Sequence, residues 1–240
     1  MSTAVSVDLE FDGDVILCAA TCWTNGFLFL PQVWCSHDLS GLVPLTPAAV
    51  ESLLQALWDH HVAGVTLVTW GGTGCDWPKL LKAAPAFADK IKAMALGSVD
   101  IPLVSVAANG MMMGLSATAM GMGFGFRPSC ESELVPSMWN SKDAVKQHEV
   151  VQHVQWDAWV TVQIYNRLMF QVNFARPQLT WVTQRSGPRS VRLQRERLPS
   201  GDWGLPSVSC VLTWDEPVAR FQIPEHLHPT KLTAWLRDSH

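Results

Sequence analysis

The sequence predicts an α/β fold, in which a mixed β-sheet is flanked by helices and followed by a small β-rich C-terminal extension. Three observations predict it. Apolar and polar residues alternate at a period of two near the N-terminus, helical and strand-like segments follow each other from Pro47 onward, and strand-like segments return after Pro177. With 240 residues, 48% of them hydrophobic and 16% charged, the chain has enough apolar side chains for a full core. We expect one domain over residues 1–175 and an extension packed on it over residues 176–240.

Three antiparallel strands are expected in the first 35 residues. Residues 5–11 alternate between apolar and polar side chains, as a half-buried strand does. The turn residues Asp12-Gly13-Asp14 lead to a second apolar run over residues 15–23. Thr24-Asn25-Gly26 is a strong hairpin signal before a third strand over residues 27–34. Turns this short favour an antiparallel meander.

Helix and strand then alternate. Thr46 as the cap and Pro47 at the first helical position predict a helix that ends near Gly64. Residues 65–70 are apolar with little polar alternation, which is typical of a central strand covered on both faces. After a glycine-rich break, a helix is expected over residues 76–95.

The later segments complete the prediction. They are a short helix and loop over 111–125, a long helix over 141–170, hairpin strands over 179–183 and 190–193, a loop and strand over 203–213, and a last short helix over 230–237. A meander followed by such α/β units forms a mixed sheet flanked by helices. This order of elements is that of the ribonuclease H-like architecture.

Two carboxylates lie on the first strand. Asp8 and Glu10 are two residues apart, so both side chains point to the same face. Two adjacent carboxylates among apolar residues repel each other and are costly to bury unless a cation holds them. Mg²⁺ prefers oxygen ligands of this kind. The alternative is a solvated pair on an exposed strand face.

Two further carboxylates strengthen the metal hypothesis. Asp76 follows the buried strand at the start of a helix, where α/β folds build their sites. As an alternative, it is an ordinary acidic residue favoured by the helix dipole. Asp157 lies in the long helix one turn after His153, so both project from one face. The alternative for this pair is a place on the exposed helix surface.

Three segments together resemble the motifs of the DEDD superfamily of 3′–5′ exonucleases, which includes the proofreading domains of DNA polymerases and the ribonuclease D group. They are residues 8–10, 69–81 and 153–161, and the resemblance extends over residues 4–170. Two positions depart from the family pattern. The second motif lacks the usual Asn and aromatic residue before Asp76, and the third has His153 at the spacing that the family uses for tyrosine. The subgroup therefore stays open.

The resemblance implies a ribonuclease H-like, metal-dependent 3′–5′ exonuclease that hydrolyses phosphodiester bonds with two Mg²⁺ or Mn²⁺ ions. It implies that Asp8 bridges the ions, that Glu10 and Asp157 hold the ion that binds the attacking water, and that Asp76 acts through water on the other. His153 would accept a proton from that water, because an imidazole titrates near neutral pH. The implied substrate is single-stranded nucleic acid or a nucleic-acid 3′ end.

Candidate nucleic-acid contacts lie in the tail and beside the carboxylates. Arginines that could bind phosphates cluster at Arg185, Arg189, Arg192, Arg195 and Arg197. The alternative is a solvated hairpin face. Trp70 and Trp77 flank Asp76 and could stack on a base, although tryptophan is more often a core residue.

Composition excludes several other classes of protein. A net charge of −4 and a pI near 6.0 exclude a globally basic, histone-like protein. No apolar run is long enough to span a membrane, and Met1–Val7 lacks the features of a signal peptide, so we expect a cytoplasmic protein. The six cysteines form no CxxC pair, which favours reduced intracellular thiols.

Two other functions stay open. One is a catalytically weak or inactive nucleic-acid-binding module that kept the fold. The other is a different two-metal phosphoesterase or an endonuclease on the same fold. Because the sequence carries no polymerase domain, a proofreading role would require a polymerase or replication partner.

Overall fold

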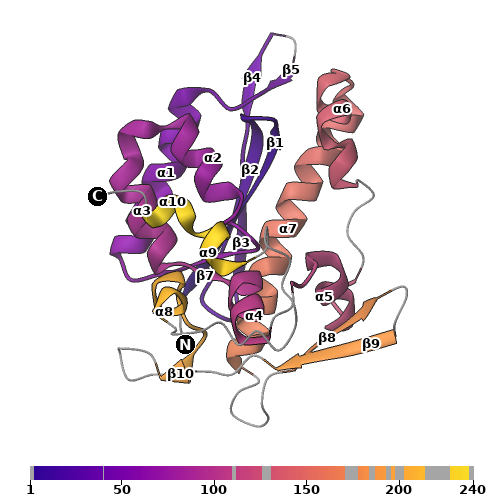
Figure 1. Cartoon of the computed structure of the whole chain (residues 1–240). Coiled ribbons are helices and arrows are strands. Elements are labelled where there is room, and N and C mark those ends of the chain that lie inside the picture. The colour runs from indigo at the N-terminus through magenta and orange to yellow at the C-terminus, as the bar shows by residue number, and fades with distance from the viewer. Residues whose placement is uncertain are drawn as a thin grey trace.

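The protein is built around a five-stranded mixed sheet (Figure 1). The structure, a computed structural model, describes residues 3–39, 41–109, 112–125, 131–170, 178–183, 187–192, 196–197, 203–213 and 228–237. The strand order is β3-β2-β1-β6-β7, with bounds β1 Ala4–Asp12, β2 Val15–Thr24, β3 Phe29–Trp34, β6 Thr66–Thr69 and β7 Val99–Asp100. Strands β1, β2 and β3 pair antiparallel, and β6 and β7 continue the sheet parallel to β1. The predicted ribonuclease H-like sheet is therefore confirmed.

The alternation along β1 divides its side chains between the two faces of the sheet. Val5, Val7 and Leu9 are buried in a core that also contains residues of α1, α2 and α3. Ser6 lies on the opposite face, where its hydroxyl donates a 2.5 Å hydrogen bond to the carbonyl oxygen of Ala158 in α7. Because side chains two residues apart share a face, Glu10 also projects toward α7.

Three helices cover the first face: α1 (Pro47–Val62), α2 (Asp76–Ala83) and α3 (Ala88–Gly97). The predicted start of α1 is confirmed, since the Thr46 side chain accepts a hydrogen bond from the Ala49 N–H. The single helix predicted over 76–95 is wrong, because a 3₁₀ turn at Pro85–Phe87 separates α2 from α3. Pro85 lacks the N–H that a continuing helix needs.

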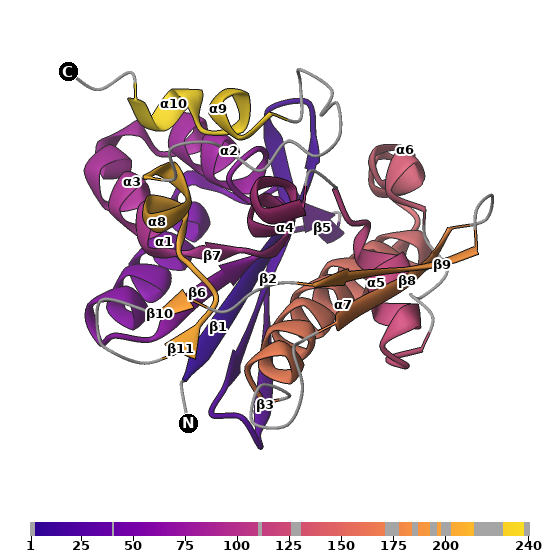
Figure 2. The ribbon, with the colours of Figure 1, turned by 60° about the horizontal axis from the view of Figure 1, so that its bottom comes forward.

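The long helix α7 (Ala144–Phe170) lies on the other face of the sheet, against β1, β2, β3 and β6 (Figure 2). Near it lie α5 (Leu115–Gly121), the 3₁₀ turn Ser132–Leu134 and α6 (Val135–Asn140). Although α7 has 27 residues, neither it nor another helix in the described ranges combines the length and apolar character needed to cross a bilayer.

Several elements were not predicted. Residues Ser36–Asp38 (β4) and Gly41–Val43 (β5) form a small ribbon. The two-residue strand β7 is followed at once by α4 (Ile101–Asn109). Residues 101–107 of α4 are all buried, so the helix has no polar stripe that would reveal a helical period.

Several of the described C-terminal elements contact helices that precede them in the chain. The predicted hairpin is confirmed as β8 (Gln178–Thr183) and β9 (Gly187–Arg192), and β8 lies against α5. The other elements are β10 (Glu196–Arg197), β11 (Trp203–Gly204), α8 (Val208–Leu212), α9 (Pro229–Leu232) and α10 (Ala234–Arg237). Helix α8 stands where the sequence predicted loop and strand, and the Ser207 side chain caps its start.

Candidate active site

Acidic residues gather at the carboxyl edge of the parallel strands. The β1–β6 pairing ends at Ser6 and Val68, so Asp8 and Glu10 extend beyond β6. Asp100 ends β7 at the same edge, and Asp76 begins α2 after the loop that follows β6. This edge is where open α/β sheets build binding sites.

Glu10, His153 and Asp157 form a compact group. The His153 Nε2 atom lies 3.2 Å from Glu10 Oε1 and 3.8 Å from Asp157 Oδ2. One potential ligand atom from each of the three residues lies within 4.8 Å of the others, and all three residues are buried. Asp157 and His153 are one turn apart in α7, and the nearby Ser6–Ala158 hydrogen bond holds this part of α7 against β1.

Asp76 lies near this group, on the other side of β1. The Leu9 N–H, between the two acidic residues of β1, donates a hydrogen bond to the buried Asp76 carboxylate. Burial raises the pKa of Asp76 well above its usual 3.8, and the charges of Asp8, Asp100 and Glu10 raise it further. Asp8 itself is half-buried.

The donor set fits divalent cations. Carboxylates that share a buried edge repel one another, and either a proton or a cation relieves that repulsion. Carboxylate oxygens suit Mg²⁺ and Mn²⁺. The structure thus brings Asp8, Glu10, Asp76, His153 and Asp157 to one region, and the buried group of Glu10, His153 and Asp157 has the arrangement to hold a metal ion.

Asp100 is a central residue of the candidate site that was not predicted from the sequence. Its carboxylate is 1% exposed and accepts hydrogen bonds from the N–H groups of Gly71 at 3.0 Å, Thr73 at 2.8 Å and Leu103 at 3.3 Å. The carboxylate therefore caps α4 and ties down the loop that leads to Asp76. The pattern Asp100-Ile101-Pro102, an N-cap residue with proline in the first turn, was the available signal.

Two glycines allow the loop to take this path. Gly71 has a φ of +80°, in the left-handed region that favours glycine. A Cβ atom on Gly72 would lie 2.6 Å from the Cβ of Thr69, closer than real contacts allow. The glycine-rich break seen in the sequence is thus a tight turn at the end of β6.

The C-terminal helices α9 and α10 cover the same loop. The Trp235 indole N–H donates a 2.8 Å hydrogen bond to the Thr73 carbonyl. The Leu232 side chain lies so near Gly74 that a Cβ there would meet Leu232 Cδ2 at 2.9 Å. The loop before Asp76 is therefore held by Asp100 on one side and by the C-terminal helices on the other.

Replacing Trp235 with Phe tests this contact. The variant keeps most of the apolar ring but leaves the Thr73 carbonyl without its donor, so we expect a stability loss of about 1 kcal/mol. We also expect a weaker affinity for divalent cations, because the loop positions Asp76. Urea unfolding and calorimetric metal titration measure the two effects. A Trp235→Phe protein with wild-type values in both would show that the contact is dispensable.

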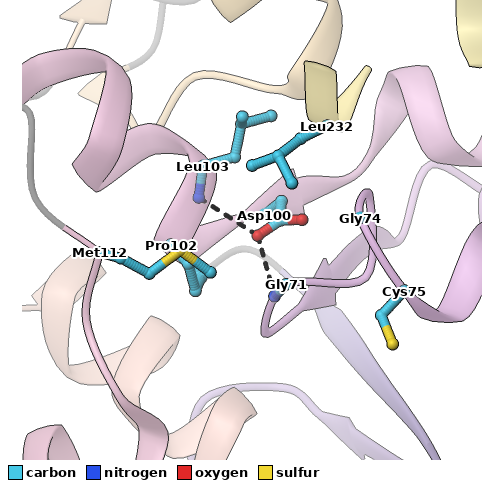
Figure 3. A pocket seen from close by; sticks show the side chains of 8 residues that line it. All are labelled: Gly71, Gly74, Cys75, Asp100, Pro102, Leu103, Met112 and Leu232. Atoms are coloured by element: carbon cyan, nitrogen blue, oxygen red, sulfur yellow. Dashed lines mark hydrogen bonds between the residues drawn. The ribbon is translucent and has the colours of Figure 1, made fainter. Parts of the chain in front are cut away.

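A pocket of about 170 Å³ opens beside this loop (Figure 3). It is lined by Gly71, Gly74, Cys75, Asp100, Pro102, Leu103, Met112 and Leu232. Burial, together with the nearby charge of Asp76, raises the pKa of the Cys75 thiol to about 12. Cys75 is thus a thiol rather than a nucleophilic thiolate at neutral pH.

The structure places the predicted nucleic-acid-binding residues in different environments. Trp77 is 0% exposed and lies in the core with α1–α3, so its ring is not available to stack on a base, and that expectation is corrected. Trp70 is half-buried against the core on the α7 side. In β9, Arg189 pairs with Trp181 and Arg192 pairs with Gln178, but the positions of the two arginine side chains are outside what the structure describes. Residues Arg185 and Arg195 lie outside the described residues.

The raised pKa values predict how metal-free protein responds to pH. Asp76 and Asp100 both have a pKa above the usual 3.8, so the folded state binds their protons more tightly than the unfolded state does. We therefore expect these two groups to increase stability as the pH falls from neutral toward about 4. Bound Mn²⁺ or Mg²⁺ should reverse the trend by favouring the charged forms.

The measurement is the melting temperature in EDTA at pH 7.5 and pH 5, in wild type and in Asp76→Asn. The gain on acidification should shrink in Asp76→Asn, since one of the two groups no longer titrates. An equal gain in both proteins would contradict the assignment of this effect to Asp76.

Comparison with known proteins supports the fold. No family model and no curated protein matches the sequence. Among solved structures, the family B DNA polymerase from the hyperthermophilic archaeon Pyrobaculum calidifontis is similar, with a TM-score of 0.54 and 14% identity over 70% of this chain. This chain spans a quarter of that polymerase. A likeness at this identity shows a shared fold.

Proposed function

We propose that the protein is a metal-dependent 3′–5′ exonuclease that hydrolyses phosphodiester bonds at nucleic-acid 3′ ends. One observation supports the proposal: Asp8, Glu10 and Asp76 lie near one another at the carboxyl edge of the sheet, and Asp157 of α7 lies near Glu10. Along the chain these residues follow the order of the DEDD motifs. The fold shared with a DNA polymerase is compatible with a nucleic-acid enzyme.

Each residue has a task in this proposal. Two Mg²⁺ or Mn²⁺ ions, when bound, would activate water and stabilise the charge that develops at the cleaved phosphate. Asp8, Glu10, Asp76 and Asp157 would hold them. The Leu9 N–H and the loop held by Asp100 keep the Asp76 carboxylate in place. Two roles fit His153, which lies against both Glu10 and Asp157: accepting a proton from the attacking water, or binding an ion directly.

The substrate side of the proposal includes the C-terminal extension. We propose that residues 1–175 form the exonuclease domain and that residues 176–240 contribute to binding the nucleic-acid strand. The arginines of residues 185–197 would bind phosphates, which their planar donor groups fit well. Proofreading would in addition require a separate polymerase partner.

The test uses 5′-labelled single-stranded DNA and RNA oligonucleotides with Mg²⁺ or Mn²⁺. A ladder of products shortened one nucleotide at a time is expected, and a 3′-phosphate block should stop it. Internal cleavage of the blocked oligonucleotide would instead identify an endonuclease. No cleavage of any substrate with either metal would refute a hydrolytic function.

The position of His153 favours a second candidate, a catalytically inactive nucleic-acid-binding module. The His153 ring nitrogen faces Glu10 and Asp157, so a protonated imidazole there would supply positive charge in place of a metal ion. Such a module would bind oligonucleotides without cleaving them. It would show no heat of Mg²⁺ or Mn²⁺ binding and no metal-dependent rise in melting temperature.

A further inference from the structure

We infer that His153 is a direct metal ligand, and that Glu10, His153 and Asp157 together form a site that prefers a divalent first-row transition metal to Mg²⁺. The inference deepens the proposed function, because it concerns the metal class of the same site. It replaces the role of proton acceptor, which the sequence alone suggested for His153.

The first support is the distance between the ligand atoms. Atoms that bind one ion at about 2.0–2.2 Å lie about 3.0–3.5 Å apart when they occupy adjacent positions around it. His153 Nε2 is 3.2 Å from Glu10 Oε1 and 3.8 Å from Asp157 Oδ2, and the three ligand atoms lie within 4.8 Å of one another. The three side chains are therefore close to the separations that coordination needs.

The second support is the orientation and burial of the ring. The same nitrogen, Nε2, is the one near both carboxylates, so the ring is directed between them. His153 is 0% exposed, with the buried residues Val150 and Val154 beside it in α7. A ring enclosed in this way is fixed in direction, which suits a ligand better than a base that must exchange protons with solvent.

The third support is chemical. A set made only of carboxylates matches Mg²⁺, which prefers oxygen and retains several waters. An imidazole nitrogen adds a softer donor that favours ions such as Mn²⁺, Co²⁺ or Zn²⁺, in the order of increasing affinity that nitrogen ligands generally show. Replacing one oxygen ligand by His153 thus shifts the preference away from Mg²⁺.

The experiment uses the full-length protein with Mn²⁺ as the probe, because its unpaired electrons report the nuclei bound to it. Pulsed electron paramagnetic resonance of the Mn²⁺ complex should show coupling to a directly bound ¹⁴N nucleus. The coupling should change to that of ¹⁵N when all histidines carry ¹⁵N. His153→Gln should abolish it, while His148→Gln, which removes an exposed histidine of the same helix, should leave it intact.

Affinity provides the second readout. Calorimetric titration of His153→Gln should show Mn²⁺ binding weakened by about 10–100-fold, and Mg²⁺ binding nearly unchanged. Wild-type protein that binds Mn²⁺ without nitrogen coupling, or His153→Gln that keeps it, would overturn the inference. If His153→Gln does not fold, a protein in which the other seven of the eight histidines are glutamine must retain the coupling.

The test of His153 as a metal ligand and the test of exonuclease activity can give different results. Nitrogen coupling in a protein that cleaves no oligonucleotide would support the ligand assignment and refute the exonuclease. Exonuclease activity in a protein whose bound Mn²⁺ shows no nitrogen coupling would support the enzyme and refute the ligand assignment.

Discussion

Asp8→Asn is expected to abolish cleavage while leaving the fold intact. In the proposed function Asp8 would help to hold the metal ions, and losing metal-derived stabilisation of several kcal/mol corresponds to a rate reduction of about 10³-fold or more. The substitution should slightly stabilise the metal-free protein. Among the neighbouring charges, that of Asp8 contributes most to raising the pKa of Asp76, so removing it relieves repulsion.

Oligonucleotide cleavage and melting temperature in EDTA measure the two effects of this substitution. Asp89→Asn is a suitable control, because Asp89 is an exposed carboxylate in the first turn of α3, outside the acidic edge. The control should keep its activity. Near-normal cleavage by Asp8→Asn would show that the reaction takes place elsewhere or does not use this carboxylate.

Asp100→Ala is expected to have the largest effect on stability. It leaves the buried N–H groups of Thr73 and Leu103, and the half-buried N–H of Gly71, without their acceptor. Each buried donor without a partner costs about 1–3 kcal/mol, so we expect a total loss of about 3 kcal/mol or more. Metal affinity should also fall, since the loop that precedes Asp76 loses its anchor.

Asp100→Asn separates the hydrogen bonds from the charge. Its amide oxygen can still accept, so about half of the stability loss should be recovered, and removing the charge should lower the repulsion felt by Asp76. Equilibrium unfolding in urea measures both variants. A free energy of unfolding for Asp100→Ala within about 0.5 kcal/mol of the wild-type value, as is usual for surface variants, would show that Asp100 does not anchor the loop.

Asp8 and Asp100 contribute to the same candidate site in different ways. Asp8 belongs to the acidic group that would contact the metal ions, whereas Asp100 acts through the backbone of the loop before Asp76. Loss of activity without loss of stability is therefore expected for Asp8→Asn, and loss of both for Asp100→Ala. This contrast distinguishes a residue that would hold the ions from one that positions their ligands.

Features that depend on local periodicity could be predicted from the sequence. Alternation along residues 5–11 placed Asp8 and Glu10 on one face of β1, and helical spacing placed His153 and Asp157 on one face of α7. The two short turns before β2 and β3 fixed the meander. These features depend on neighbours a few residues apart, so a single sequence can show them.

The contacts between these segments could not be predicted from the sequence, because they depend on how the whole chain folds. Asp100 lies 24 positions after Asp76, in a two-residue strand. The helix that follows is buried over residues 101–107, so neither period is visible there, yet Asp100 anchors the loop of the site. Trp77 follows Asp76 directly, but the helix turns its ring into the core. His153 comes against Glu10 because the Ser6–Ala158 hydrogen bond and apolar packing hold α7 on β1. Such contacts join residues far apart in the chain, and they form only when the sheet and its helices bury their apolar faces together.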